Sequence, residues 1–241
     1  MKSFLLIALF IVCNGYLFAQ TTSDTLTPVK KDWGKTQLSG RAADHIMIQF
    51  GYNGWSGETD SVRSRGFSRT FNMYFMYDFP FKSSPHFSAG VGVGIGTDNM
   101  FLKETTTDLR KSPLSLAHDT SINYKKYKLA TGYLEIPLEL RYTANPANFN
   151  KSFKVALGVK VGTMIDAHTK AKITSDNAGN GGYTLKIRDR RNFNSTRLAG
   201  TLRVGYGVFS IFGTYQFNPF VKDGYGPDIK PFSIGLCISG L

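Results

Sequence analysis

Charged side chains recur at even spacing along segments of the chain that are otherwise apolar. The intervals between them are two, four or six residues, so in extended strands each set falls on one face. Two chemistries fit such a face: a charged pore or proton path, or a set of ion pairs that fills a closed interior. Buried charges persist when they are paired, so we favour the paired interior. The residues are Glu135, Glu139 and Arg141, then Lys154, Lys160 and Asp166, then Arg197 and Arg203.

A second group of charges is basic and falls in a segment without regular apolar alternation. One interpretation is a solvated loop whose cations aid solubility. The other is contact with anionic lipid head groups, lipopolysaccharide or an acidic surface glycan, because clustered Lys and Arg are attracted to anionic membranes. The residues are Lys170, Lys172, Lys186, Arg188, Arg190 and Arg191.

Motifs for catalysis, cofactors or metals are weak. The glycines at 90, 92, 94 and 96 do not form a nucleotide loop, because the third glycine of that motif is missing and no helix follows. The four histidines lack the spacing of a metal site. His118, Asp119 and Ser121 resemble a hydrolytic cluster only in composition, and we interpret them as a polar loop. We therefore expect no enzyme, no cofactor and no metal.

The elements that must position these residues are strands. Among 241 residues, 14% are aromatic, 25 are glycine and only 19% are charged, a composition that favours strands and tight turns. This aromatic content also excludes a disordered chain. After the N-terminus no apolar run reaches ~18 residues, which excludes a helical membrane protein.

The N-terminus has the form of an export signal. Lys2 precedes an apolar stretch over 4–12, and a polar exit ends at Ala19. We predict a cleaved signal peptide over 1–19 and a flexible periplasmic segment over 20–43. Without the signal peptide the chain has one cysteine, Cys237, so no internal disulfide forms.

From residue 44 to the end, apolar and polar residues alternate with the period of a strand. The third segment is the clearest, with Val91, Val93 and Ile95 alternating with glycines. The alternation predicts eight strands, over 46–53, 67–79, 87–96, 134–142, 153–166, 197–206, 209–217 and 232–239.

The connections between these strands alternate between long and short. Long ones fall at 53–66, 98–124, 167–195 and 218–230, and short ones at 80–85, 143–152 and 205–208. With antiparallel neighbours, the long loops gather at one end and the short turns at the other. This is the topology of an eight-stranded up-and-down transmembrane β-barrel with long external loops and short periplasmic turns.

The glycine-rich polar face decides which side points outward. Glycines facing inward make room for large and charged side chains in a narrow barrel. The outward face is then apolar, with aromatic girdles formed by Tyr142, Phe153 and Tyr206 on the turn side and Phe67, Phe217 and Phe232 on the loop side. The alternative is a secreted lipocalin-like barrel or β-sandwich. Pro137 predicts a local bulge around 131–137, since it cannot donate to a ladder.

The segment Tyr133-Leu-Glu-Ile-Pro-Leu-Glu-Leu-Arg-Tyr142 resembles a strand of the PorT-like outer-membrane β-barrel family. The glycine-alternating segment 88–96 and the C-terminal segment 233–241 are similar to that family too. The resemblance covers residues 44–241 and implies an eight-stranded barrel in a bacterial outer membrane. The family is named after a component of a secretion and gliding machinery, and it carries no known catalytic residues. Glu139 and Arg141 stand where many members have Leu and Lys.

We therefore predict a non-enzymatic barrel in the bacterial outer membrane with a structural, interaction or secretion-accessory role. The alternative is a small channel or a binding barrel for a solute. The expected partners are outer-membrane lipid, lipopolysaccharide or an acidic glycan at the external loops, and secretion-machinery proteins. No nucleic acid is expected at a surface-exposed barrel, despite the net charge of +12.

Overall fold

The computed structural model describes residues 46–57, 67–102, 105–114, 117–118, 124–146, 148–174 and 182–240. The predicted signal peptide (1–19), the predicted segment 20–43, and Asp119 and Ser121 lie outside these ranges. Within them, no helix has the length and hydropathy needed to cross a membrane. The one helical element in these ranges is the 3-10 turn η3 (Phe149–Lys151).

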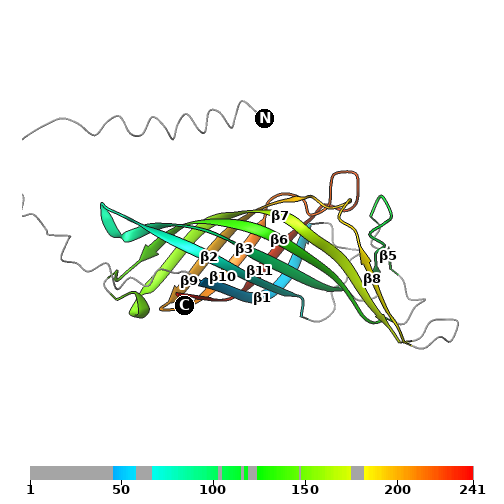
Figure 1. Cartoon of the computed structure of the whole chain (residues 1–241), viewed down its shortest axis with the longest axis horizontal. Helices are drawn as coiled ribbons and strands as arrows, with labels where there is room; N and C mark the ends of the chain where they lie inside the picture. Colours follow the sequence, from blue (N-terminus) through cyan, green and yellow to red (C-terminus); the bar gives the residue numbers. More distant parts are fainter. Residues whose placement is uncertain are drawn as a thin grey trace, which may run out of the picture. The chain divides into compact units, whose positions relative to one another are not determined.

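Eight strands close into an antiparallel barrel (Figure 1). Its strands are β1 (Ile46–Gly57), β2 (Arg69–Phe81), β3 (Ser84–Leu102), β6 (Tyr124–Thr143), β7 (Phe153–Ile173), β9 (Thr196–Tyr206), β10 (Phe209–Gln216) and β11 (Ile229–Ser239). Each strand pairs with its neighbours in the chain, and β1 pairs with β11 to close the ring. Full closure leaves no sheet edge in the barrel. The predicted eight-stranded fold is confirmed.

Connections at the two ends of the barrel differ in length. The short turns at one end are formed by residues 82–83, by 144–146 with 148–152, and by 207–208. The other end carries β4 (Thr105–Thr106) and β5 (Ala117–His118), which pair with each other, and β8 (Thr184–Arg188), which pairs with the end of β7. By the usual topology of outer-membrane barrels, this second end is external.

The two faces of the wall have opposite chemistry. Outward side chains are apolar and exposed, as with Leu157 (63%) and Leu236 (66%). Inward side chains are buried and include many charged and polar ones, as with Glu135 (0%) and Lys160 (2%), beside apolar ones such as Phe212. The predicted girdle residues also point outward, and Tyr142 packs its ring 5.2 Å from that of Phe87. A lipocalin-like barrel has the reverse arrangement, so that alternative is wrong.

Strands β6 and β7 run well past their predicted external ends. We expected loops over 98–124 and 167–195, but β6 begins at Tyr124 and β7 continues to Ile173. The ladder between the two strands shifts register at Gly132/Tyr133, where Met164 and Asp166 are successive partners and Ile165 is extra. This β-bulge reverses the alternation of β7, so that even-numbered residues point inward before it and outward after it.

Pro137 lies in an unbroken stretch of β6. Pro137 is paired with Lys160 of β7. On the other side, Ile136 and Pro137 are not paired with β3, but the residues before and after them keep the same register. The missing amide therefore faces β3 and is tolerated by a local loss of pairing. The β-bulge predicted around 131–137 is present at Gly132/Tyr133, but its extra residue is Ile165 of β7, and the ladder stays in register at Pro137 itself.

Candidate functional site: a filled lumen and a basic outer sheet

The half of the lumen near the short turns holds a linear series of four charges. Asp78 lies 3.6 Å from Arg141, Arg141 lies 2.9 Å from Glu139, and Glu139 lies 2.7 Å from Arg203. Arg203 also donates to Ser239 at 3.2 Å. Because two carboxylates meet two guanidinium groups, the series has no net charge.

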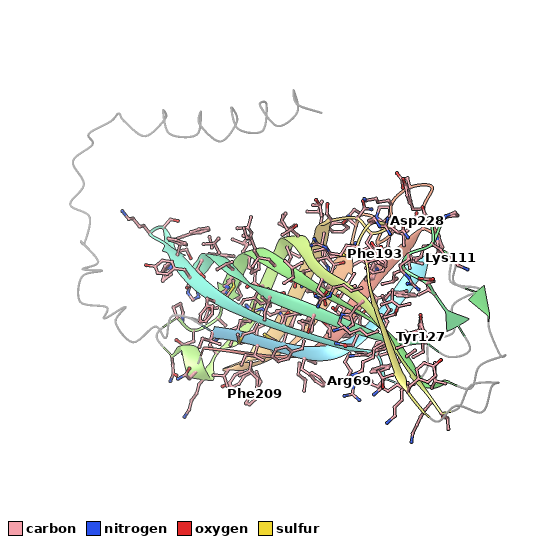
Figure 2. All side chains as sticks on the ribbon, turned by 45° about the vertical axis from the view of Figure 1, so that its right-hand side comes forward. Arg69, Lys111, Tyr127, Phe193, Phe209 and Asp228 are labelled. Atoms are coloured by element: carbon pink, nitrogen blue, oxygen red, sulfur yellow. The ribbon has the colours of Figure 1, made fainter. Side chains whose placement is uncertain are left out.

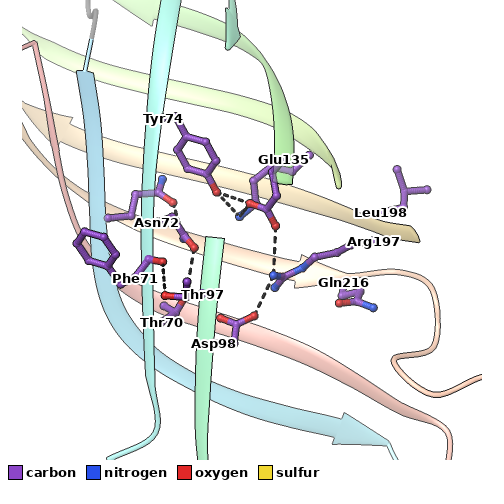
Figure 3. A network of polar contacts seen from close by, with 12 residues as sticks. Thr70, Phe71, Asn72, Tyr74, Thr97, Asp98, Glu135, Arg197, Leu198 and Gln216 are labelled. Atoms are coloured by element: carbon purple, nitrogen blue, oxygen red, sulfur yellow. Dashed lines mark hydrogen bonds and ion pairs between the residues drawn. The ribbon is translucent and has the colours of Figure 1, made fainter. Parts of the chain in front are cut away.

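A second series of four charges lies nearer the external end, and Figure 3 shows its members Asp98, Glu135 and Arg197 together with Tyr74. Lys160 lies 3.4 Å from Glu135, and Arg197 joins Glu135 at 3.2 Å to Asp98 at 2.9 Å. The Tyr74 hydroxyl donates to Glu135 and accepts from Lys160 at 3.1 Å. This series is neutral as well, and all of its charged side chains are buried.

Close approach of these side chains requires glycine on the facing strand. A Cβ at Gly90 would lie 2.7 Å from Arg141 Nε, and a Cβ at Gly94 would lie 2.6 Å from Tyr74 Cα. The alternating glycines of β3 therefore leave the volume that the charged and aromatic groups occupy. Small and large side chains therefore complement each other across the lumen.

The structure places six of the eight predicted interior charges in the two series, Lys154 beside the first series, and Asp166 outside the lumen. The Lys154 ammonium borders a cavity of about 20 Å³ beside Arg141 and Arg203. Asp166 was expected to point inward, and that expectation is wrong. The β7 bulge turns it outward, where it pairs with Arg188 at 2.8 Å and with His168 at 2.7 Å.

Three members of the two series were missing from the predicted cluster, namely Asp78, Asp98 and Tyr74. The predicted cluster included residues of β6, β7 and β9 only, whereas these three residues come from β2 and β3. The alternation of the sequence could have identified the two aspartates. Asp78 and Asp98 continue the even-numbered inward positions of their strands, with the parity that places the glycines of β3 inside.

The external end of the lumen is covered by a hydrophobic cap made by the loops. Residues from three connections pack on inward side chains of the strands, and Figure 2 shows Phe193 at this end, opposite Phe209. Phe193 packs against Phe220 with ring centroids 4.8 Å apart and the ring planes tilted by 47°. The buried members are Met100, Leu109, Leu114, Leu129, Tyr133, Met164, Ala167, Phe193, Phe220, Val221 and Ile229.

Two asparagines tie the loops of the cap together. The Asn192 amide donates to the carbonyls of Leu109 at 3.2 Å and Lys111 at 2.6 Å. The Asn194 amide donates to the carbonyls of Pro219 and Val221. Since each asparagine satisfies two backbone acceptors, the cap is held by hydrogen bonds as well as by apolar packing.

The three arginines of the predicted basic loop form ion pairs or hydrogen bonds within the protein. Arg188 pairs with Asp166, and Arg190 donates to the carbonyls of Met164 and Ile165 at the bulge. Arg191 pairs with Asp189 at 2.7 Å, and its hydrogen bonds hold the pKa of Asp189 below the ordinary value.

The three lysines of the same prediction are strand residues. Lys170 and Lys172 belong to β7 and Lys186 to β8, and all three are exposed on the outward face. The strand continues here because inward residues such as Thr169 and Ala171 are buried. Among the described residues, no three or more His, Cys, Asp or Glu side chains gather in a way that could hold a metal ion.

A closed antiparallel barrel with an apolar outer wall and a charged, filled interior defines a β-barrel of the outer-membrane class. Residues 18–222 match the family described as outer membrane protein beta-barrel domain. The chain belongs to that family, and this places it in the outer membrane. The match ends in the connection between β10 and β11.

Among solved structures, the barrel is similar to Ail, the attachment invasion locus protein of Yersinia pestis. It was solved alone and in complex with the heparin analogue sucrose octasulfate. In both comparisons the identity is 14%, the TM-score is 0.32 and 80% of this chain is covered, with 95% of the Ail chain covered for the complex and 94% for Ail alone. No curated protein matches the chain significantly.

Proposed function

We propose that the protein is a non-enzymatic, non-conducting barrel that acts through its external surface. The observation that carries the proposal is the filling of the lumen. Two neutral series of ion pairs occupy its length, and the cap covers its external end. A solute path would have to break buried ion pairs, each of which is costly to separate.

The external surface is the part left for a partner. Beyond the membrane-facing wall, the ends of β6 and β7 together with β8 form a sheet with cations on its outward face. We propose that this sheet meets anionic material of the cell surface and that a structural, interaction or secretion-accessory role rests on that contact. The resemblance of residues 133–142 to the PorT-like family supports the secretion-accessory form of this proposal.

The alternative function, a channel or binding barrel for a small solute, is tested by liposome swelling. Purified barrel is incorporated into liposomes, which are then diluted into neutral sugars and amino acids, with an open porin as the positive control. We expect the same swelling rate as in empty liposomes. A faster rate that depends on solute size would overturn the proposal.

A further inference from the structure

Beyond the barrel wall, β6, β7 and β8 continue as a small antiparallel sheet with two unlike faces. Inward residues are packed, as Tyr127, Leu129 and Ala171 are buried. The outward face carries five lysines, which we call the lysine ladder: Lys126, Lys128, Lys170, Lys172 and Lys186.

The strand register places these lysines directly beside one another. Lys128 is opposite Lys170, and Lys170 is opposite Lys186, while Lys126 is opposite Lys172. Neighbouring strands lie ~4.8 Å apart, and like charges at facing positions destabilise a sheet. Among the described residues, no acidic side chain forms an ion pair with any of the five, whereas Arg188 of the same sheet has Asp166.

The repulsion is felt most by the partly buried member. Burial lowers the pKa of Lys128 below its ordinary value, and the charges of Lys126, Lys170, Lys186 and Arg69 lower it further. Its ammonium donates to Asn99 at 2.7 Å, a neutral acceptor that leaves the charge uncompensated. A concentration of cations that has no acidic partner among the described residues is matched to an anion supplied from outside.

The surroundings of the ladder indicate a membrane-surface ligand. Lys126 lies 4.7 Å from the ring of Phe101, and Arg69 lies 5.8 Å from the same ring. Phe101, Phe67, Arg69 and Lys126 line a cavity of about 270 Å³. Aromatic and cationic side chains that adjoin an apolar wall are typical of the level of lipid head groups.

We propose that the lysine ladder binds the phosphate groups of phosphorylated lipids in the outer leaflet of the outer membrane. The ladder lies on the outward face of its sheet, and its facing pairs of lysines offer a phosphate more than one ammonium group. This inference deepens the proposed surface role by naming its ligand, and it holds or fails independently of whether the lumen conducts. The ladder thereby adds Lys126 and Lys128 to the basic residues expected from the sequence, and Arg69 lies beside it.

The test compares two variants from which equal charge has been removed. The first is Lys170→Gln/Lys172→Gln/Lys186→Gln in the ladder. The second is Lys82→Gln/Lys111→Gln/Lys151→Gln, at exposed lysines outside it. Each protein is placed in phosphatidylcholine nanodiscs with 10% diphosphorylated lipid A or its dephosphorylated form, and bound lipid is counted by native mass spectrometry. A gel-mobility shift on boiling confirms that each barrel is folded.

We expect the wild type and the second variant to retain the diphosphorylated lipid and the ladder variant to lose it, on the order of tenfold to 100-fold. Inorganic phosphate at equal concentration should compete weakly, because it lacks the lipid anchor. The proposal is overturned by equal retention in both variants, by equal binding of the dephosphorylated lipid, by full competition from inorganic phosphate, or by ladder-dependent binding of a soluble carboxylated glycan alone.

Discussion

One guanidinium nitrogen of Arg197 bridges two carboxylates that lie far apart in the sequence. Its Nη1 is 2.9 Å from Asp98 Oδ2 and 3.2 Å from Glu135 Oε1, and all three side chains are buried. The contact joins β9 to β3 and β6 across the lumen, and Arg197 also lies 4.8 Å from the ring of Tyr133. This residue therefore links the charged interior to the hydrophobic cap.

Replacing Arg197 by alanine should destabilise the barrel by about 3–5 kcal/mol, because Glu135 and Asp98 would keep one cation, Lys160, between them. Urea unfolding in detergent, followed by the mobility of unheated samples on gels, measures the change. The double variant Arg197→Met/Glu135→Gln should recover part of the loss. Arg191→Ala, which removes an exposed guanidinium at the protein surface, should change the midpoint little. A midpoint for Arg197→Ala equal to that of wild type would contradict the assigned pairing.

The space above Tyr74 is tested by adding one methyl group. Gly94→Ala would place a Cβ against the backbone of Met73 and Tyr74, so we expect a loss of about 1–3 kcal/mol or failure to fold. Gly213 has no atom within 4 Å of its Cβ position, and Gly213→Ala should be neutral or stabilising by about 0.5 kcal/mol. Comparable stability of the two variants in the same urea assay would show that the interior is not tightly packed.

The cap should loosen without the barrel unfolding when Asn192 is changed. Asn192→Ala leaves the carbonyls of Leu109 and Lys111 without their donor, at a cost of about 1–3 kcal/mol. We expect faster hydrogen exchange over 105–114 and unchanged heat-dependent gel mobility. Asn150→Ala, in the exposed turn at the opposite end, serves as the control and should leave exchange over 105–114 as in wild type.

Removal of the Lys128 charge should stabilise the protein at neutral pH. Its folded pKa is lowered, so the charged form costs stability at low and neutral pH, and the cost disappears as the pH rises past the unfolded value of about 10.4. Lys128→Gln should raise the urea midpoint at pH 7 in low salt, with a smaller gain in 1 M NaCl, where the Debye length is ~3 Å. A lower midpoint would mean that the lysines do not repel one another.

Period-two alternation was sufficient to predict the eight strands and the outward face. Outward residues such as Leu138 and inward ones such as Glu139 alternate without interruption wherever the wall faces lipid. The alternation of apolar and polar residues does not extend to the external ends of β6 and β7. The outward residues there are lysines, so they do not differ in polarity from the inward ones as outward residues do elsewhere. The β7 strand was therefore ended too early, at residue 166, and Lys170 and Lys172 were assigned to a loop.

The misplacement of Asp166 has a single cause. One extra residue at the β7 bulge reverses parity, and no local residue type marks it. The cap could not be predicted from the sequence either. Leu109, Phe193 and Phe220 lie in connections without periodicity, and closure of the barrel brings them together. Pairings such as Arg197 with Asp98 depend on registers that neighbouring strands set together. The face of a charge could be predicted, but its partner could not.

If ion pairs and the cap close the lumen, the folded protein should carry no current across a planar bilayer. Folded wild-type protein is added to a bilayer in 1 M KCl, and current is recorded over both polarities, with an open porin as the positive control. We predict a flat baseline without discrete openings after insertion, which is verified by recovery of heat-modifiable protein from the membrane. Reproducible unitary steps in the wild type that disappear on changing Lys160 or Glu139 would show that the lumen is an open path.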